Sequence, residues 1–423
     1  MNRDISRPDE KRLLRGHKTS QEPLERPDNP IDQQVTDMTS VTRNQNRTLA
    51  LPTHVLRVAR RNSILVLLVL LLVVLTLLQA DGAKEIGSYY KLIEWNTVGA
   101  LAGILIITTG IKESNFLSKV AGQILNRPLS ERKLALLLVT LSALLATFLT
   151  NDITLLVIIP LTMSLQARLE NDISKMIIFE AIAVNIGSAL TPVGNPQNLF
   201  LWHEWGLSFI AFTVKMTPLV AVLLLLLLLL VRFSFGEREL KAGVCTNDRY
   251  DGRLLVLSLI LLGGYLTAVE FKCVAYALPV IVLVYAMFYE YVLREVDWPV
   301  ILIFVLMFVD FGLISELDLV VQFMGRLGQM SAGGIFGYAT LISQVISNVP
   351  AAVLVSRFSD NWPAITYGVN VGGNGIVTAS LANLIALRMI GDRKIWPKFH
   401  KYSLGYLSVS ACLTYLLLCL LLA

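Results

Sequence analysis

AVNIGSALTPVGNPQNLF, residues 183–200, interrupts an otherwise apolar chain with three asparagines, two glycines and two prolines. A near copy, GVNVGGNGIVTASLANLI, follows at residues 368–385. The two copies align without gaps, so that Asn185 falls on Asn370, and a second pair of asparagines aligns thirteen residues later. Glycine and proline are the residues that most often end or kink a helix. The sequence therefore contains the same polar break twice.

The composition of the chain excludes a soluble protein with a single core. Of the 423 residues, 55% are hydrophobic and 16% are charged, and the mean hydropathy is +0.63. Such a chain has more apolar surface than one soluble core can cover. Apolar runs of about 20 residues, long enough to cross the hydrocarbon region of a bilayer, recur from residue 64 to the C-terminus. We therefore predict an all-α polytopic membrane protein.

The beginning of the chain differs from the rest. Residues 1–60 are rich in Arg, Asp, Pro, Asn and Thr and have almost no apolar clusters, which is the composition of a disordered segment. We predict a disordered cytoplasmic N-terminal tail over residues 1–60 and a transmembrane transporter domain over residues 61–423. Arg57, Arg60 and Arg61 precede the first span, and we interpret them as a solvated anchor, because lipid-headgroup sites usually have a denser basic cluster.

Positive charges predict how the chain crosses the membrane. Lys and Arg collect in cytoplasmic loops, and placing residues 57–61 inside also places the basic loop at residues 232–253 inside. The pattern predicts nine full crossings and two re-entrant hairpins, with the tips Thr150-Asn151-Asp152 and Ser347-Asn348-Val349. The N-terminus is then cytoplasmic and the C-terminus periplasmic.

Two parts of the domain share this pattern. About residues 94–205 and about residues 297–390 each contain a crossing, a hairpin and a broken segment, and the charges give them opposite orientations. An inverted repeat with two re-entrant hairpins and two broken transmembrane helices is typical of secondary transporters whose site lies near the midplane. The N-termini of half-helices suit an anionic group, while carbonyl and Asn oxygens suit a cation such as sodium.

Polar residues and glycines at the tips and breaks are the candidate substrate- and ion-binding residues. They are Thr150, Asn151, Asp152, Asn185, Gly187, Ser188, Thr191, Gly194, Asn195, Asn198, Ser347, Asn348, Asn370, Gly372, Gly373, Asn374, Ser380 and Asn383. Backbone groups freed inside a bilayer are costly unless protein, water or a ligand satisfies them, so we expect a shared polar cavity. The sequence has no metal-ligating cluster, phosphate loop or nucleophile motif, and we expect no catalysis, metal site or cofactor.

Three acidic residues fall inside predicted membrane segments. Asp152 lies at the first hairpin tip, Glu180 lies before the first break, and Asp310 lies within the span 298–315. An intramembrane carboxylate is costly, which makes each of them a candidate for coupling to sodium ions or protons. Asp152 also suits a hairpin cap, and Glu180 and Asp310 also suit ordinary interhelical pairs, with Lys215 as a partner. The sequence leaves both interpretations open.

Four strings around the tips and breaks are long and specific. They are FLTND at 148–152, LTPVGNPQN at 190–198, SQVISNVP at 343–350 and SLANLIALR at 380–388. These strings resemble the ion transporter superfamily, which holds arsenite permeases, NhaD-type sodium/proton antiporters and citrate and dicarboxylate transporters. The resemblance covers roughly residues 60–423 and implies paired hairpin tips that meet paired unwound helices. Dicarboxylate transporters of this superfamily bear Ser-Asn-Thr at both tips, whereas the first tip here resembles the Asn-Asp tips of arsenite permeases.

These observations predict an ion-coupled secondary active transporter of the bacterial inner membrane that moves a small anion or oxyanion, with sodium ion or proton as the coupling ion. A sodium/proton antiporter or an arsenite efflux permease is the alternative within transport. A passive channel or a transport-dead membrane receptor is the alternative from another class, although hairpins that stop at the midplane from opposite sides suit alternating access. The expected partners are the lipid bilayer and a small-molecule or ionic substrate, without nucleic acid, and a homodimer is left open.

Overall fold

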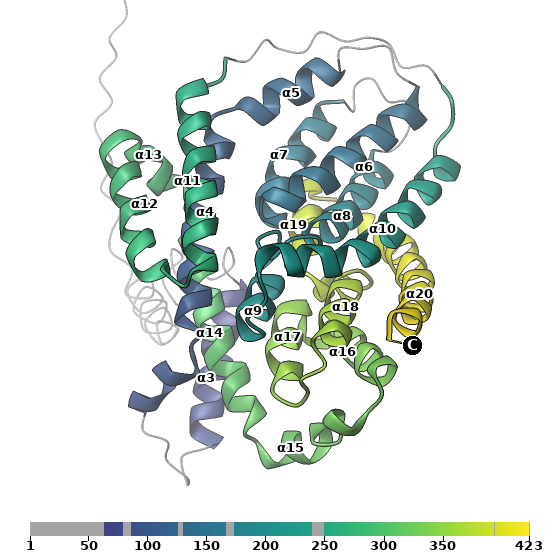
Figure 1. The fold of residues 1–423 in the computed structure, drawn as a ribbon. Coiled ribbons are helices and arrows are strands. Elements are labelled where there is room, and N and C mark those ends of the chain that lie inside the picture. Colours follow the sequence, from purple (N-terminus) through teal and green to yellow (C-terminus); the bar gives the residue numbers. More distant parts are fainter. Residues whose placement is uncertain are drawn as a thin grey trace, which may run out of the picture. The chain divides into compact units, whose positions relative to one another are not determined.

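The computed structural model describes residues 63–78, 86–125, 130–165, 173–238, 249–392 and 394–422. These residues form helices joined by connecting segments, and none of them lies in a β-strand (Figure 1). Five of the described helices are long and apolar enough to cross a membrane. The prediction of an all-α polytopic membrane protein is therefore confirmed, while the predicted tail at residues 1–60 lies outside the described residues.

The first half of the domain contains a hairpin and a broken helix. Its elements are α3 (Ser63–Leu78), η2 (Ile86–Leu92), α4 (Trp95–Glu113), α5 (Phe116–Leu125), α6 (Glu131–Phe148), α7 (Asn151–Ser164), α8 (Ser174–Ser188), α9 (Pro196–Glu204) and α10 (Phe209–Ser234). The arms of the hairpin are α6 and α7, and the break separates α8 from α9.

The second half has the same order of elements after an inserted group of three helices. The inserted group is α11 (Gly252–Glu270), α12 (Val274–Phe288) and α13 (Glu290–Glu295). The remaining elements are α14 (Trp298–Ser315), α15 (Asp318–Met324), η4 (Leu327–Gln329), α16 (Ala332–Ile346), α17 (Asn348–Ser356), α18 (Trp362–Gly372), η5 (Val377–Ala379), α19 (Leu381–Ile390) and α20 (Ile395–Leu422). A long helix, a short helix, a hairpin, a broken helix and a long helix thus follow one another twice. The opposite orientation of the two halves stays a prediction.

The inserted helices pack against α4, where buried tyrosines meet small residues. Figure 1 shows α11 and α12 beside α4. The hydroxyl of Tyr265 donates to the carbonyl of Gly99 at 2.7 Å, and the hydroxyl of Tyr285 lies 2.8 Å from that of Ser258. A Cβ atom at Gly103 would lie 2.1 Å from the ring of Tyr265. Glycine at this position therefore allows α11 to approach α4 closely.

Each hairpin packs against the broken helix of its own half through small residues. The first arm α6 runs along α8, and α16 runs along α18. A Cβ atom at Gly187 would lie 2.0 Å from the carbonyl oxygen of Ala143, and one at Gly372 would lie 2.9 Å from that of Thr340. Small residues let helix backbones approach in this way inside membranes. Two glycines proposed as site residues therefore act as packing points directly beside the breaks.

Replacing Gly187 by Ala is expected to destabilise the domain. The new methyl group would overlap the backbone oxygen of Ala143, which cannot move aside as a flexible side chain can. Overpacking of this kind costs about 1–3 kcal/mol, and thermal unfolding of the purified protein in detergent measures the loss. Gly263→Ala is the matched control, because no atom of the described ranges outside the neighbouring backbone of its own helix lies within 4 Å of its added Cβ. Equal melting temperatures for the two variants would contradict the close contact.

The predicted inverted repeat requires the two hairpins to begin on opposite sides of the membrane. Lys133 lies at the start of α6, and Ser331 lies at the start of α16. In a background without the four native cysteines, an impermeant maleimide added to intact cells should label Ser331→Cys but not Lys133→Cys. Inverted vesicles should show the reverse result. If both positions react from the same side, the two halves are not inverted.

Candidate functional site

The two breaks lie in buried parts of the domain, and each ends at a polar residue that precedes the next helix. Residues 189–195 separate α8 from α9, and residues 373–380 separate α18 from α19. The side-chain oxygen of Asn195 accepts a hydrogen bond from the backbone N–H of Asn198 at 2.9 Å. This is the usual way in which an N-cap satisfies one of the free N–H groups of a helix. Ser380 occupies the matching position before α19.

Two pairs of asparagines join the breaks directly. Nδ2 of Asn185 donates to Oδ1 of Asn383 at 2.8 Å, and Nδ2 of Asn370 donates to Oδ1 of Asn198 at 2.7 Å. Each pair combines a residue just before one break with a residue just after the other break. All four side chains are at most 5% exposed. The structure thus brings the four asparagines together, but it bonds them to one another.

The other polar atoms of these four side chains are also bonded. Oδ1 of Asn185 accepts from the hydroxyl of Ser380, and Oδ1 of Asn370 accepts from Nδ2 of Asn195, both at 3.1 Å. The amide nitrogens of the remaining two asparagines donate to break carbonyls, at Ser188, Ala189 and Thr191 for Asn198 and at Gly373 and Ile376 for Asn383. We call this set of bonds the asparagine network. The network is closed, because the side-chain nitrogen of each of its four central asparagines donates a hydrogen bond within it and the side-chain oxygen accepts one within it.

The network has an internal twofold pattern. The bond from Asn185 to Asn383 becomes the bond between Asn370 and Asn198 when each residue is exchanged for its partner 185 positions away. The bond from Ser380 to Asn185 becomes the bond from Asn195 to Asn370 in the same way. The offset found in the sequence alignment is therefore also the offset of the hydrogen bonds, which supports the predicted repeat.

Each hairpin tip contacts the break of its own half. The backbone N–H of Asn151 donates to the carbonyl of Gly194 at 3.1 Å, and the hydroxyl of Ser347 donates to the carbonyl of Ala379 at 3.4 Å. Ser347 has a φ of +77°, which L-residues rarely adopt. Such a conformation costs about 1–3 kcal/mol and is held in place by its surroundings. The second tip is therefore a strained segment next to the network.

Four helices begin at the tips and breaks. The helices α7 and α17 start at the tips, while α9 and α19 start directly after the breaks. In addition, α7 packs against α19, and α17 packs against α9. A helix N-terminus carries a partial positive charge and free N–H donors. The arrangement therefore gathers four partly positive helix ends around the asparagine network.

Several polar atoms in this region are buried without a hydrogen-bond partner in the described part of the chain. They are Oγ1 of Thr150, Oδ1 of Asp152, Oε1 of Gln197 and both amide atoms of Asn374. Leaving a buried polar group unpaired costs about 1–3 kcal/mol. Such unpaired groups are rare in native proteins, and a bound ligand or an ordered water is one of the reasons for which they occur. These atoms can take up a ligand without breaking the network.

Most of the residues predicted from the sequence lie in this one region. Thr150, Asn151, Asp152, Ser347 and Asn348 form the tips, while Asn185, Ser188, Asn195, Asn198, Asn370, Gly373, Ser380 and Asn383 take part in the network. Gly187 and Gly372 are packing points, and Thr191, Gly194 and Asn374 lie in the breaks. Their roles in binding stay predictions.

Two of the predicted coupling residues lie elsewhere. Oε1 of Glu180 accepts from the hydroxyl of Thr162 at 2.5 Å, between α7 and α8. Within the described ranges, Oε2 of Glu180 and both oxygens of Asp310 have no partner. Neither residue forms an ion pair with Lys215 among the described residues. The Lys215 ammonium lies instead over the ring of Trp362, 5.4 Å from its centre. The interhelical pairing with Lys215 considered from the sequence is therefore wrong.

Sequence reasoning missed three polar residues of the region. Besides Gln197, these are Gln344 and Thr147, which hold the two hairpins on the broken helices. Nε2 of Gln344 donates to the carbonyl of Gly372 at 2.6 Å, and the hydroxyl of Thr147 donates to that of Gly187 at 3.2 Å. Both glutamines lie within the specific strings around the breaks and tips, so the strings themselves were the available signal.

A second polar group lies at the far end of α9. Nδ1 of His203 lies 3.2 Å from the hydroxyl of Thr97 on α4. Burial and the neighbouring Glu204 raise the pKa of Glu94, which precedes α4, while Arg357 opposes this shift. The described residues include no group of three or more His, Cys, Asp or Glu side chains that could hold a metal ion. This group connects α4 to α9 and has no donor set for a metal.

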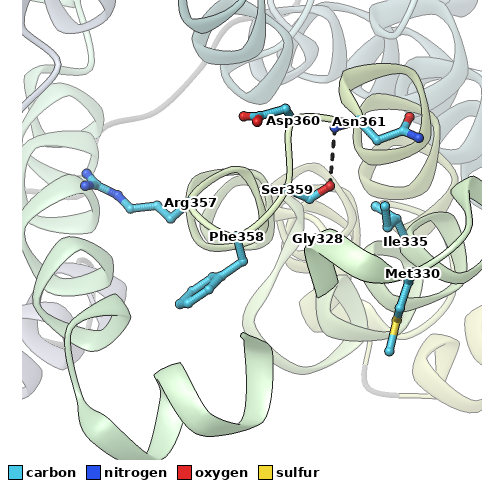
Figure 2. Close-up of a pocket in the computed structure, with 8 residues that line it drawn as sticks. All are labelled: Gly328, Met330, Ile335, Arg357, Phe358, Ser359, Asp360 and Asn361. Atoms are coloured by element: carbon cyan, nitrogen blue, oxygen red, sulfur yellow. Dashed lines mark hydrogen bonds between the residues drawn. The ribbon is translucent and has the colours of Figure 1, made fainter. Parts of the chain in front are cut away.

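A cavity of about 530 Å³ lies beside the segment that joins α17 to α18. It is lined by Gly328, Met330, Ile335, Arg357, Phe358, Ser359, Asp360 and Asn361. In Figure 2 the side chain of Arg357 points away from that of Asn361, whose backbone N–H donates to the hydroxyl of Ser359 at 3.3 Å. None of the residues predicted for the site lines this cavity. Its polar groups do not converge, and we do not assign it as the functional site.

Comparison with known proteins agrees with this architecture. A family model described as Citrate transporter matches residues 54–419. Inner membrane protein YbiR of Escherichia coli K12 is 38% identical over 336 residues, which are 79% of this chain and 90% of that relative. An uncharacterized transporter of Methanocaldococcus jannaschii is 34% identical over 323 residues, 75% of this chain and 86% of that relative. The chain therefore belongs to the citrate transporter family and is a multi-pass membrane transporter.

Proposed function

We propose that this chain is an ion-coupled secondary active transporter that carries a small anion or oxyanion across the bacterial inner membrane. The observation that carries this proposal is the gathering of four helix N-termini around one buried polar region. Helix N-termini attract anions through their free N–H groups and their dipole. The family, and the name of YbiR as an inner membrane protein, support the same conclusion.

The charge balance of the region favours coupling to a cation. Within the described part of the chain, no lysine or arginine side chain is buried. None of the predicted site residues is positively charged. An anion that leaves water for this region lacks a full opposite charge, and an unpaired buried charge is costly. A sodium ion or a proton that travels with the anion supplies the missing charge.

We assign the coupling ion to Asp152 at the first tip. The corresponding position of the second tip is Val349, so the carboxylate has no twin. Oδ1 of Asp152 and the hydroxyl of the adjacent Thr150 have no partner among the described residues. A carboxylate in the membrane is stable when it is protonated or lies beside a cation. Oxygen atoms of this kind suit a sodium ion as well as a proton.

Flux measurements on proteoliposomes distinguish this function from its alternatives. Imposed sodium and proton gradients are tested with a panel of small carboxylates, inorganic oxyanions and arsenite. Accumulation of an anion above equilibrium supports coupled transport. Sodium/proton exchange without anion movement identifies an antiporter, and movement of arsenite alone identifies a metalloid permease. Equilibration without accumulation identifies a channel, and no flux of any kind fits a receptor.

Asp152→Asn is expected to abolish accumulation that is driven by a gradient. The substitution keeps the size of the side chain but removes the charge that takes up the coupling ion, so exchange of bound substrate can remain. Asp318→Asn is the matched control, because Asp318 also lies in the first turn of a helix but is exposed. Wild-type accumulation by Asp152→Asn, with unchanged sodium and pH dependence, would move the coupling role to Glu180 or Asp310.

A further inference from the structure

The last helix, α20, holds the backbone of the second break. The N–H of Gly375 donates to the hydroxyl of Ser403 on α20 at 2.8 Å. The N–H of Val377 donates to Nε2 of His400, also on α20, at 3.4 Å. Between them, the N–H of residue 376 donates to Oε1 of Gln344 on α16 at 3.0 Å. Three consecutive N–H groups of the break therefore have side-chain partners on other helices.

The first break differs at the matching positions. At the offset of 185 residues, Gly375 aligns with Leu190, and Val377 aligns with Pro192. The N–H of Leu190 donates to a carbonyl of its own helix α8 at 3.2 Å, and proline has no N–H to donate. The bond to His400 therefore belongs to one half of the domain, and the twofold pattern of the asparagine network does not account for it.

The two hydrogen bonds of His400 require one protonation state of its ring. Nδ1 lies 2.7 Å from the carbonyl oxygen of Trp396, four residues earlier in α20. A carbonyl only accepts, so Nδ1 carries the single proton of a neutral imidazole. The backbone N–H of Val377 only donates, so Nε2 carries no proton. A second proton on the ring would occupy Nε2 and set one donor against another. The bond between α20 and the break therefore needs a neutral His400.

Loss of this bond would affect the asparagine network. His400 is half-buried and in contact with solvent, whereas Val377 is buried and its N–H would lose its partner, which is costly for a backbone group. The carbonyls of Gly373 and Ile376, in the same break, accept from Nδ2 of Asn383. The segment that α20 holds on its N–H side is thus the segment that the network holds on its carbonyl side.

We propose that His400 is a positioning residue that ties the second break to α20 while its ring is neutral and releases the break when its ring is protonated. Histidine is the side chain that ordinarily changes its charge between about pH 5 and 8. The bond therefore contributes at the upper end of this range and is lost as the pH falls. Mild acid then removes one support of the polar region. The effect of this release on transport rests on the proposed function.

Other charged groups on α20 and on the helices packed against it also influence the ring. They are Lys398 and Lys401 on α20, Lys175 and Glu180 on α8, and Lys215 and Arg232 on α10. The remaining neighbours of α20, which are α16, α18 and η5, contain no Asp, Glu, Lys, Arg or His. Replacing His400 alone keeps all of these groups, so their own titration is common to the wild type and the variants.

Exchange of backbone amide hydrogens measures the hold on the break without any substrate. Purified full-length protein in detergent is transferred to deuterium oxide between pH 5 and pH 8, and mass spectrometry follows the peptide that covers residues 374–380. His400→Gln has an amide oxygen that accepts but does not titrate, and His400→Ala has no acceptor. Each variant is compared with the wild type at the same pH, so that the chemical pH dependence of exchange cancels.

The wild type should match His400→Gln at pH 8 and His400→Ala at pH 5. Its exchange relative to His400→Gln should rise about fivefold between these limits, the factor expected for the loss of one net hydrogen bond. Ser403→Ala is the contrasting control. It should speed exchange relative to the wild type by one constant factor across the range, because the hydroxyl that it removes does not titrate. The peptide of the first break, residues 189–195, should show no change in the ratio.

Three results would overturn the inference. The first is a ratio of wild type to His400→Gln that is the same at pH 5 and pH 8, and this comparison decides alone if His400→Ala does not fold. The second is equal exchange of the wild type and His400→Ala at pH 8. The third is an equal rise in residues 189–195, which would mean a general loosening. None of them bears on the proposed transport function, and a lack of anion flux would not bear on the role of His400.

Discussion

A helix that stops inside a bilayer exposes N–H and C=O groups that water cannot reach, and such groups are costly unless the protein satisfies them. In this chain asparagine amides meet that need. Asn198 and Asn383 bind the carbonyls of the break before them, and both are held by an asparagine of the other half. Each break therefore needs an asparagine of the other half to complete its hydrogen bonds. The two halves must therefore lie together for either of them to fold as observed.

The close approach of the helices follows from the same positions in the sequence. Gly187 and Gly372 come two residues after the asparagines that bridge the halves. Because they lack side chains, the hairpin arms α6 and α16 lie directly on the helices that break. Thr147 and Gln344 then reach the carbonyls of these same glycines. Packing and hydrogen bonding thus place each hairpin tip beside a break.

The polar groups of this region fall into two classes with different physical roles. The four central asparagines, which follow the twofold pattern, are bonded within the protein and stabilise it, since each hydrogen bond contributes roughly 1 kcal/mol net. Asp152, Gln197 and Asn374, whose counterparts in the other half are apolar, have unpaired atoms among the described residues and reduce stability. Proteins retain such unfavourable groups mainly where function requires them. The unpaired atoms, and not those of the closed asparagine network, are therefore the ones available to a ligand.

The amino-acid sequence was enough to predict the membrane class, the all-helical fold, the positions of both breaks and the offset of 185 residues between them. These are local properties, because the length of an apolar run and the presence of Gly, Pro and Asn can be read within one segment. The bonds among the four central asparagines, and the lack of partners for Oε1 of Gln197 and the amide of Asn374 among the described residues, could be found in the folded arrangement alone. A hydrogen bond needs two groups within about 3 Å, and here the partners come from segments far apart in the chain. Whether a polar group has a hydrogen-bond partner therefore depends on the folded arrangement and cannot be read from either segment alone.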